Sequence, residues 1–195
     1  AYERRYSQYD INLVKPDLIV SRARAFTIGG RMYAQGQEVQ PLDEAAIPRL
    51  AEKIAESGAE AVAICLMHAY ANPTHELKVR DLLQDWLPDL VISLSHEVSP
   101  EAREFDRLST TIANAYIQPL MVSYLSAFQT RFSQEGLMCP ILMMTAGGGM
   151  TTIETAARLP IRLVESGPAG GAILAARLAA ETGEAKVLSF DMGGT

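Results

Sequence analysis

Cysteine is scarce in this sequence. Only two occur among 195 residues, Cys65 in an apolar run and Cys139 before a proline. Two such thiols are too few for the disulfide framework of a small secreted domain, so we expect buried or incidental thiols in a cytoplasmic protein. Long apolar runs are also missing, since no stretch approaches the roughly 20 residues that span a bilayer. We therefore do not expect a membrane protein.

Basic residues are outnumbered by acidic ones. The chain has 17 lysines and arginines against 23 aspartates and glutamates, which gives a net charge of -6 and a pI near 5.1. A general nucleic-acid binder would have a basic face, so nucleic acid is not an expected partner. Hydrophobic residues make up 48% of the chain and charged residues 21%, a composition that suits a globular core rather than a disordered chain.

Strand and helix patterns alternate in the first half. The unbroken apolar run at 61–66 is typical of a strand buried on both faces of a parallel sheet. Gly29-Gly30 suggests a hairpin turn between strands at 25–28 and 31–34. Alternation of this kind predicts an α/β layer with right-handed crossovers. The other elements that we expect are strands at 18–20 and 90–94, and helices over 43–57 and 74–86.

A long helix over 108–133 dominates the second half. Its apolar stripe follows the 3.6-residue period, and Pro119 inside it predicts a kink or two abutting helices, because an interior proline costs about 3 kcal/mol. Thr151 and Glu154 match a capping box that would begin a short helix. The remaining expected elements are a strand at 141–145, an alanine-rich helix over 172–180 that stops near Gly183, and a strand at 186–190.

Three glycine-rich turns lie within the last fifty residues: Gly147-Gly148-Gly149, Ser166-Gly167-Pro168-Ala169-Gly170, and Asp191-Met192-Gly193-Gly194-Thr195. Taken singly, the first is more often a loop than a ligand site, and the second could be a capped helix that packs tightly. The third offers a carboxylate that could hold Mg²⁺ or its water, and bare backbone N–H groups for a phosphate. Such a turn is normally followed by another strand, so we expect a segment of a longer nucleotide-handling protein.

Polar residues gather at the junction of the two halves. His96 and Glu97 follow the strand at 90–94, the place where α/β proteins position ligand groups. Two interpretations remain open: a substrate- or phosphate-facing wall with His96 as acid or base, or a polar helix start with a Glu104–Arg107 pair. The residues that share spacings of three and four beyond this point are Arg103, Arg107, Thr110, Thr111 and Asn114.

Histidines elsewhere do not predict a metal site. His68 lies too far from His75 and Glu76 for the i, i+4 pair that a helical metal site needs. We expect a loop role for these three residues rather than a metal site.

Several segments together resemble the hydantoinase A and 5-oxoprolinase family. They are residues 66–76 (Leu-Met-His-Ala-Tyr-Ala-Asn-Pro-Thr-His-Glu), residues 95–116, and Ser166-Gly167-Pro168-Ala169-Gly170 leading into the terminal Asp-x-Gly-Gly-Thr. The similarity runs in register from about Tyr9 to Thr195. One departure is Thr145-Ala146, where many members have Ser-Asn before the glycine turn. The order small-residue helix, apolar strand and Asp-x-Gly-Gly-Thr is that of the actin, sugar-kinase and heat-shock ATPase superfamily.

The resemblance implies a fragment of an actin-like (ribonuclease H-like) α/β ATPase fold with βα units and one long kinked helix. Residues 1–100 would be the last part of the hydantoinase/oxoprolinase N-terminal region, and residues 101–195 the first part of the hydantoinase A domain. The implied enzyme uses ATP to open a cyclic amide such as a hydantoin or 5-oxoproline, and it phosphorylates the ring carbonyl before hydrolysis. A separate hydantoinase B-type subunit is an implied partner.

The resemblance also implies the ligands and site residues. ATP and Mg²⁺ would be the cofactors, with Asp191 orienting Mg²⁺-bound water and Gly193, Gly194 and Thr195 contacting the β- and γ-phosphates. The further cofactor-binding residues that we expect are Gly147, Gly148, Ser166 and Gly167. The expected catalytic residues are His96, Glu97, Arg103 and Asn114. Two alternatives stay open: the ATP-using subunit of a ketone carboxylase of the acetone type, and a noncatalytic regulatory or assembly module of the same fold.

The resemblance puts the first phosphate loop of the family before Ala1 and its adenine-binding part after Thr195. We therefore expect the 195-residue chain on its own to bind ATP only weakly and to turn over no substrate. Isothermal titration calorimetry checks this directly. Micromolar affinity of the isolated chain for ATP would contradict it.

Overall fold

The computed structural model describes Asn12 and residues 18–192, which form a mixed arrangement of helices and short strands. The elements in chain order are η2 (Arg22–Arg24), β1 (Arg31–Met32), β2 (Glu38–Gln40), η3 (Glu44–Ala46), α1 (Ile47–Glu56), β3 (Ala61–Ile64), α2 (Thr74–Trp86), β4 (Val91–Leu94), α3 (Ser95–Val98), α4 (Glu104–Gln134), β5 (Leu142–Met144), β6 (Met150–Thr152), α5 (Ile153–Arg158), η4 (Pro160–Leu163) and α6 (Ser166–Thr182). No helix among these described residues is long and apolar enough to cross a membrane.

The first half is built on a parallel βαβ unit. β3 and β4 pair in parallel from Ala61↔Val91 to Ile64↔Leu94, and α2 connects them. The apolar faces of α1 and α2 close one side of this pair, which explains the spacing of the apolar residues on both helices. The buried members of this first core are Leu42, Ile47, Ala51, Ile54, Ile64, Val79, Leu83 and Leu94. The expected alternation of strand and helix over 43–94 is confirmed.

A second, smaller core lies farther along the chain. β5 and β6 form an antiparallel hairpin with Met143 opposite Thr151, and α5 follows directly. Leu125 from α4 packs here against Ile153 and Ala156 of α5. This core holds the hairpin against the middle of the long helix.

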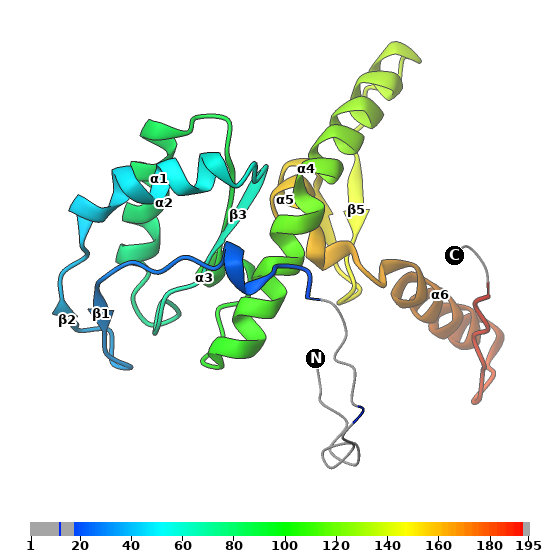
Figure 1. Ribbon diagram of the computed structural model, residues 1–195. Coiled ribbons are helices and arrows are strands. Elements are labelled where there is room, and N and C mark those ends of the chain that lie inside the picture. The colour runs from blue at the N-terminus through cyan, green and yellow to red at the C-terminus, as the bar shows by residue number, and fades with distance from the viewer. Residues whose placement is uncertain (1–11, 13–17, 193–195) are drawn as a thin grey trace.

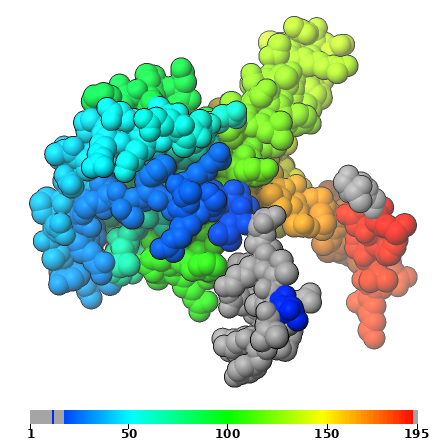
Figure 2. Space-filling model, in the orientation of Figure 1, coloured from blue at the N-terminus to red at the C-terminus, as the bar shows by residue number. Residues whose placement is uncertain are grey.

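Helix α4 joins the two cores (Figure 1). Its first half packs on β3 and β4, and its middle packs on α5 and η4. The helix runs without interruption through Pro119, so the alternative of two abutting helices is wrong. Figure 2 shows the blue-to-green first half as one mass, from which the end of α4 and the segment after residue 165 project.

The buried face of the first half of α4 is polar, contrary to the apolar stripe expected from the sequence. Tyr116 and Leu120 of that stripe are 72% and 73% exposed, whereas Met121 and Leu125 do reach the second core. The buried residues of the helix are Arg107, Thr111, Asn114, Ala115, Gln118 and Leu125. Hydrogen bonds to β4, to α3 and to the loop after β3 therefore replace apolar packing at this interface.

The hairpin expected at Gly29-Gly30 is wrong. Residues 25–28 form no strand, and the hairpin instead joins β1 to β2 through a turn in which the Gly36 N–H donates to the Tyr33 carbonyl (2.9 Å). The glycine pair instead allows the chain to pack closely against α2. A Cβ on Gly30, which has φ +143°, would lie 3.2 Å from the His75 ring. Glycine was required for contact with a helix, not for a turn.

Two other expected strands are also wrong. Residues 19–20 form a bend, and residues 18 and 186–190 form coil, with Leu188 and Phe190 88% and 79% exposed. A strand needs a neighbour to satisfy its backbone groups, and the strands of the described chain pair only with one another, as β1–β2, β3–β4 and β5–β6. An apolar pattern in the sequence does not reveal whether such a partner strand is present.

Helix boundaries differ from the sequence pattern in two places. The cap of α5 is Thr152 rather than Thr151, because the Thr155 N–H donates to the Thr152 hydroxyl (3.3 Å). Hydrogen bonds from its own backbone N–H and from Thr152 lower the pKa of Glu154. Helix α6 begins at Ser166, so the expected glycine turn at 166–170 is the first part of the helix. Its stop at Gly183, with φ +74°, is as expected.

Candidate functional site

The candidate site lies where β3 and β4 end side by side. β4 leads straight into the single turn α3, which holds Ser95, His96 and Glu97. β3 leads into a loop and then into the first turn of α2, which holds Glu76. Parallel strands bring their carboxyl ends to one edge of the sheet, and this is where open α/β proteins bind ligands.

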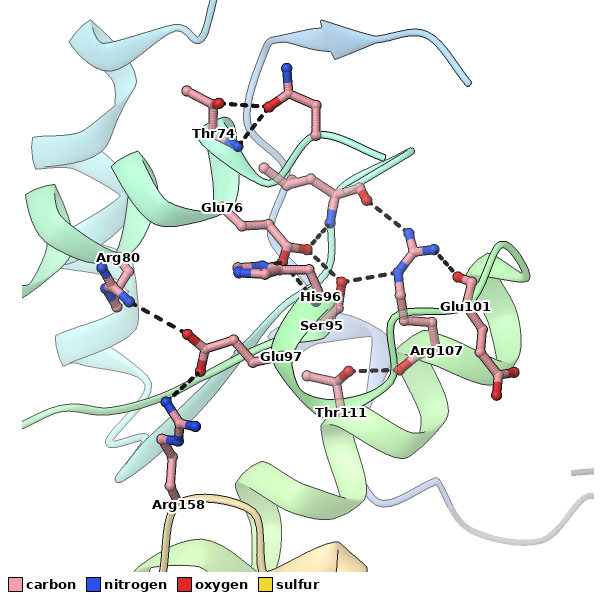
Figure 3. A network of polar contacts seen from close by, with 12 residues as sticks. Thr74, Glu76, Arg80, Ser95, His96, Glu97, Glu101, Arg107, Thr111 and Arg158 are labelled. Atoms are coloured by element: carbon pink, nitrogen blue, oxygen red, sulfur yellow. Dashed lines mark hydrogen bonds and ion pairs between the residues drawn. The ribbon is translucent and has the colours of Figure 1, made fainter. Parts of the chain in front are cut away.

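Glu76 is at the centre of the site and is 0% exposed. Its Oε1 accepts hydrogen bonds from the Leu66 N–H (2.8 Å) and the Ser95 hydroxyl (2.5 Å). Its Oε2 lies 3.1 Å from the His96 backbone nitrogen and 2.7 Å from His96 Nδ1. All four partners can donate, so the arrangement satisfies an ionised carboxylate, which only accepts (Figure 3).

The start of α2 sets the position of Glu76. The Asn72 side chain accepts from the Thr74 N–H (3.1 Å) and hydroxyl (2.6 Å), which supplies a partner for a free donor of the first turn. Asn72 Nδ2 also donates to the Gly36 carbonyl (2.8 Å) and so ties the β1–β2 turn to the helix start. A carboxylate in the first turn is favoured by the helix dipole.

Arg107 closes the other side of the site from α4 and is also 0% exposed. Its Nε donates to the Ser95 hydroxyl (3.0 Å), Nη1 to the Glu101 carbonyl (2.7 Å) and Nη2 to the Leu66 carbonyl (2.9 Å). The guanidinium carbon also lies 5.4 Å from the centre of the Tyr70 ring. Ser95 thus bridges a buried anion and a buried cation, each satisfied by several hydrogen bonds.

The Glu104–Arg107 pair of the structural interpretation is present, with 3.8 Å between Glu104 Oε1 and Arg107 Nη2. Among the described residues, this buried Glu104 oxygen has no hydrogen-bond partner. The pair is therefore a weak addition to the bonds that Arg107 makes elsewhere.

The two ring nitrogens of His96 differ, because Nδ1 is hydrogen-bonded to Glu76 and Nε2 has no partner among the described residues. Its Nδ1 lies against Glu76, whose carboxylate favours the tautomer with the proton on Nδ1. No described residue bonds Nε2, and the side chain is 16% exposed. In the neutral ring Nε2 then keeps a free lone pair, which is the arrangement that a general base needs.

Glu97 lies between two arginines, which Figure 3 shows on either side of it. Arg80 and Arg158 each place an Nη1 atom 3.8 Å from one of its carboxylate oxygens. Arg162 Nη2 donates to the Glu97 carbonyl at 3.4 Å. Arg80 also pairs with Asp81 (2.8 Å), so three guanidinium groups and two carboxylates leave this part of the site with a small excess of positive charge.

Asn114 is 0% exposed and connects β4 to the segment after α5. Its Nδ2 donates to the Ser93 hydroxyl (3.0 Å) and the Arg158 carbonyl (3.2 Å), and its Oδ1 accepts from the Ile161 N–H (3.2 Å). These bonds hold η4 in place. The structure gives Asn114 a positioning geometry, and its catalytic role stays a prediction.

The remaining expected residues lie outside this network. Arg103 is 83% exposed, and within the described part of the chain its one ion pair is with Asp106, at 3.9 Å. Asp191 is exposed and in coil. Gly147 and Gly148 form the β5–β6 turn, and Ser166 and Gly167 form the first turn of α6. The expected phosphate contacts Gly193, Gly194 and Thr195 lie outside the described residues.

Sequence reasoning missed the centre of the site. The expected helix over 74–86 contains His75 and Glu76, but both were given a loop role, whereas both are buried on α2. Ser95 was not singled out as a site residue, and Arg107 was considered only as one member of the polar set that begins at Arg103. The available signal was an acidic residue in the first turn of a helix that follows a buried strand, a place where a carboxylate can meet the next strand's end. His68 does lie in a turn, with φ +59°.

The described residues give limited support for a metal. They contain no group of three or more His, Cys, Asp or Glu side chains that could hold an ion. Mg²⁺ commonly uses one or two carboxylates together with substrate phosphates and waters, so a lone Asp191 is chemically suitable. Its role as a Mg²⁺ ligand stays a prediction.

Comparisons with known proteins give consistent matches. The sequence profile of the hydantoinase/oxoprolinase N-terminal region matches residues 1–87, and that of hydantoinase/oxoprolinase matches residues 107–195. Caprolactamase subunit alpha of Pseudomonas jessenii is 33% identical over 188 residues, which cover 96% of this chain and 27% of the relative. The crystal structure of ATP-dependent caprolactamase from that organism matches with a TM-score of 0.81 and 32% identity, covering 90% of this chain and 25% of the other.

Two further relatives show the range of chemistry. 5-oxoprolinase 1 of Arabidopsis thaliana is 31% identical over 158 residues, which cover 80% of this chain and 12% of the relative. The nucleotide-free structure of acetone carboxylase matches with a TM-score of 0.70 and 28% identity, covering 80% of this chain and 22% of the other. The chain thus spans about a quarter or less of the length of these relatives.

Replacing Glu76 tests the network. Glu76→Gln puts an amide NH₂ among donors, so at least one buried donor loses its acceptor, and we expect a loss of about 2 kcal/mol or more in the free energy of unfolding. Urea denaturation monitored by circular dichroism measures it. The matched control is Glu44→Gln, which breaks an exposed ion pair with Lys78 and should change stability by less than about 0.5 kcal/mol. Equal losses in the two variants would contradict the central position of Glu76.

The different burial of the two cysteines can be tested by chemical labelling, without a mutation. Burial raises the pKa of the half-buried Cys65 thiol, while Cys139 is exposed. A raised pKa leaves less thiolate at a given pH, so Cys139 should react with Ellman's reagent well before Cys65 at pH 8. Mass spectrometry of partially labelled protein identifies the first site. Labelling of Cys65 at the same rate would show that burial does not protect this thiol.

Proposed function

We propose that this chain, which belongs to the hydantoinase/oxoprolinase family, is part of an ATP-dependent hydrolase that opens cyclic amides. The α/β arrangement agrees with the actin-like ATPase-type fold of its structural matches. The observation on which the proposal mainly rests is the Glu76–His96 pair at the edge of the parallel strands, where Glu76 holds Nδ1 and leaves Nε2 open.

The relatives support the substrate class. Caprolactamase and 5-oxoprolinase are both named for cyclic amides, and the caprolactamase structure is described as ATP-dependent. Ring opening adds the oxygen of water to the carbonyl carbon, breaks the C–N bond and leaves an amine and a carboxylate. ATP, when bound, supplies a phosphoryl group that makes the poorly electrophilic amide carbonyl reactive.

The residues of this chain would supply the acid–base part. His96 Nε2 is the group that can take a proton from the attacking water, and Glu76 stabilises the ring in the required tautomer and the cation that forms. Arg107 and Ser95 hold Glu76 in place through the Ser95 hydroxyl. General acid–base catalysis of this kind contributes typically about 10²–10⁴-fold to a rate.

A second candidate is the ATP-using part of a ketone carboxylase. The match to acetone carboxylase favours it, because that structure shares the fold at 28% identity. Relatives named as subunits also make a second protein chain a reasonable partner in either case.

The two candidates predict different activities for the intact protein. Under the leading proposal, ATP hydrolysis depends on a lactam such as 5-oxoproline, hydantoin or caprolactam, and acetone with bicarbonate has no effect. A coupled ADP assay with each compound decides between them. Stimulation by acetone and bicarbonate alone would reject the hydrolase in favour of the carboxylase.

His96 can be tested with a conservative pair of variants. In His96→Asn, the amide nitrogen can take the place of Nδ1 and keep the bond to Glu76 while Nε2 is lost, so kcat/KM should fall about 100-fold or more with little loss of stability. His96→Ala loses both the side-chain bond to Glu76 and the Nε2 atom, and should therefore also lower the free energy of unfolding. Full lactamase activity in His96→Asn would exclude the base role.

A further inference from the structure

A hollow of about 410 Å³ lies beside the turn between β5 and β6. Its lining is Thr145, Ala146, Gly147, Met150, Thr151 and Arg162. The Thr145 hydroxyl already donates to the Gly149 carbonyl (3.0 Å), so the polar groups that remain are the Thr151 hydroxyl, the exposed Gly147 backbone and the Arg162 guanidinium, with no carboxylate among them. A hollow of this composition favours a negatively charged oxygen ligand.

The two glycines of the turn have different surroundings. A Cβ on Gly148, which has φ +81°, would lie 2.8 Å from Ile173 Cδ1, so Gly148 allows α6 to pack against the turn. A Cβ on Gly147 would meet no atom within 4 Å. Among the described residues, the Gly147 N–H has no backbone acceptor, whereas the Gly148 N–H donates to the Thr145 carbonyl (2.9 Å). Gly147 is therefore the glycine whose N–H group is available to a ligand.

Arg162 contributes the charge. Arg80 and Arg158 approach the carboxylate of Glu97, but no described carboxylate lies within ion-pair distance of Arg162. Its one side-chain hydrogen bond in the described chain is the long 3.4 Å contact from Nη2 to the Glu97 carbonyl. A guanidinium presents five N–H donors, so most of its capacity remains for a ligand.

The fold fixes Arg162 against the turn. The Ala146 N–H donates to the Arg162 carbonyl (2.8 Å), which joins the backbone of the turn to η4. Asn114 holds the same segment through the Ile161 N–H (3.2 Å). The contact from Arg162 to Glu97 also links the hollow to α3, the turn that bears His96. These bonds fix the backbone at Arg162 beside the turn, while its exposed side chain keeps only the contact to Glu97.

We propose that this hollow binds a phosphate group, with Arg162 and the Gly147 N–H as its donors and Thr151 on its wall. Arginine forms two parallel charge-assisted hydrogen bonds with such an anion, and a free glycine N–H lets the phosphate approach the backbone closely. The phosphate is that of the nucleotide or that of the phosphorylated substrate and its released phosphate; this identification of the source rests on the proposed function.

Nuclear magnetic resonance of the ¹⁵N-labelled 195-residue chain tests the site with inorganic phosphate. The Gly147 amide and the Arg162 Nε–H should shift and saturate on titration. Arg162→Gln should weaken the affinity about tenfold or more, because it removes the charge-assisted bonds. The matched control is Arg177→Gln on α6, whose side chain is 77% exposed and pairs with Glu181. It should bind phosphate as the wild type does.

Unchanged affinity in Arg162→Gln, with the rest of its spectrum intact, would overturn the proposal, and so would shifts spread over the surface without Gly147. A titration with ATP separates the two sources. Tighter binding of ATP than of phosphate at Gly147 assigns the site to the nucleotide, and equal binding assigns it to the phosphorylated substrate or product. Lactam-dependent ATP hydrolysis by the intact protein is measured separately, so its absence would reject the proposed hydrolase while saturable phosphate binding at Arg162 would still stand.

Discussion

The buried carboxylate of Glu76 is the constraint on which the arrangement of this chain depends. An ionised group without solvent is stable in a protein only if several donors surround it. Here the donors come from the loop after β3, from α3 and, through Ser95, from Arg107 of α4. Satisfying one carboxylate therefore fixes the edge of the parallel strands, the turn with His96 and the start of the long helix together.

The same constraint explains why α4 presents a polar face to the sheet. Arg107, Thr111 and Asn114 are buried along this face, and each makes hydrogen bonds to the backbone or side chains around it. Polar contacts have stricter geometry than apolar ones, so this helix can hold both cores and η4 in one register. The proposed acid–base pair and the proposed phosphate hollow are connected through the contact between Arg162 and the Glu97 carbonyl.

The sequence predicted the elements that have a strong local pattern. The βαβ unit over 61–94, the long helix and the stop at Gly183 have the periodicity or the glycine that their geometry needs, and they agree with the structure. Residues 18–20 and 186–190 show apolar patterns that need a strand partner, which a local pattern cannot reveal. Gly29-Gly30 has the composition of a turn but is used for contact with His75. The edge position of His96 and Glu97 was predictable from strand order, whereas Glu76 depends on a contact 20 residues away.

The most direct test of this account is the tautomer of His96, which Glu76 should determine. Long-range ¹H–¹⁵N spectra of the neutral imidazole distinguish a protonated from an unprotonated ring nitrogen. The account predicts a proton on Nδ1 and a bare Nε2 in the wild-type chain, opposite to the form that free histidine prefers. A proton found on Nε2 would mean that Glu76 does not hold this ring, and the central interaction would be contradicted.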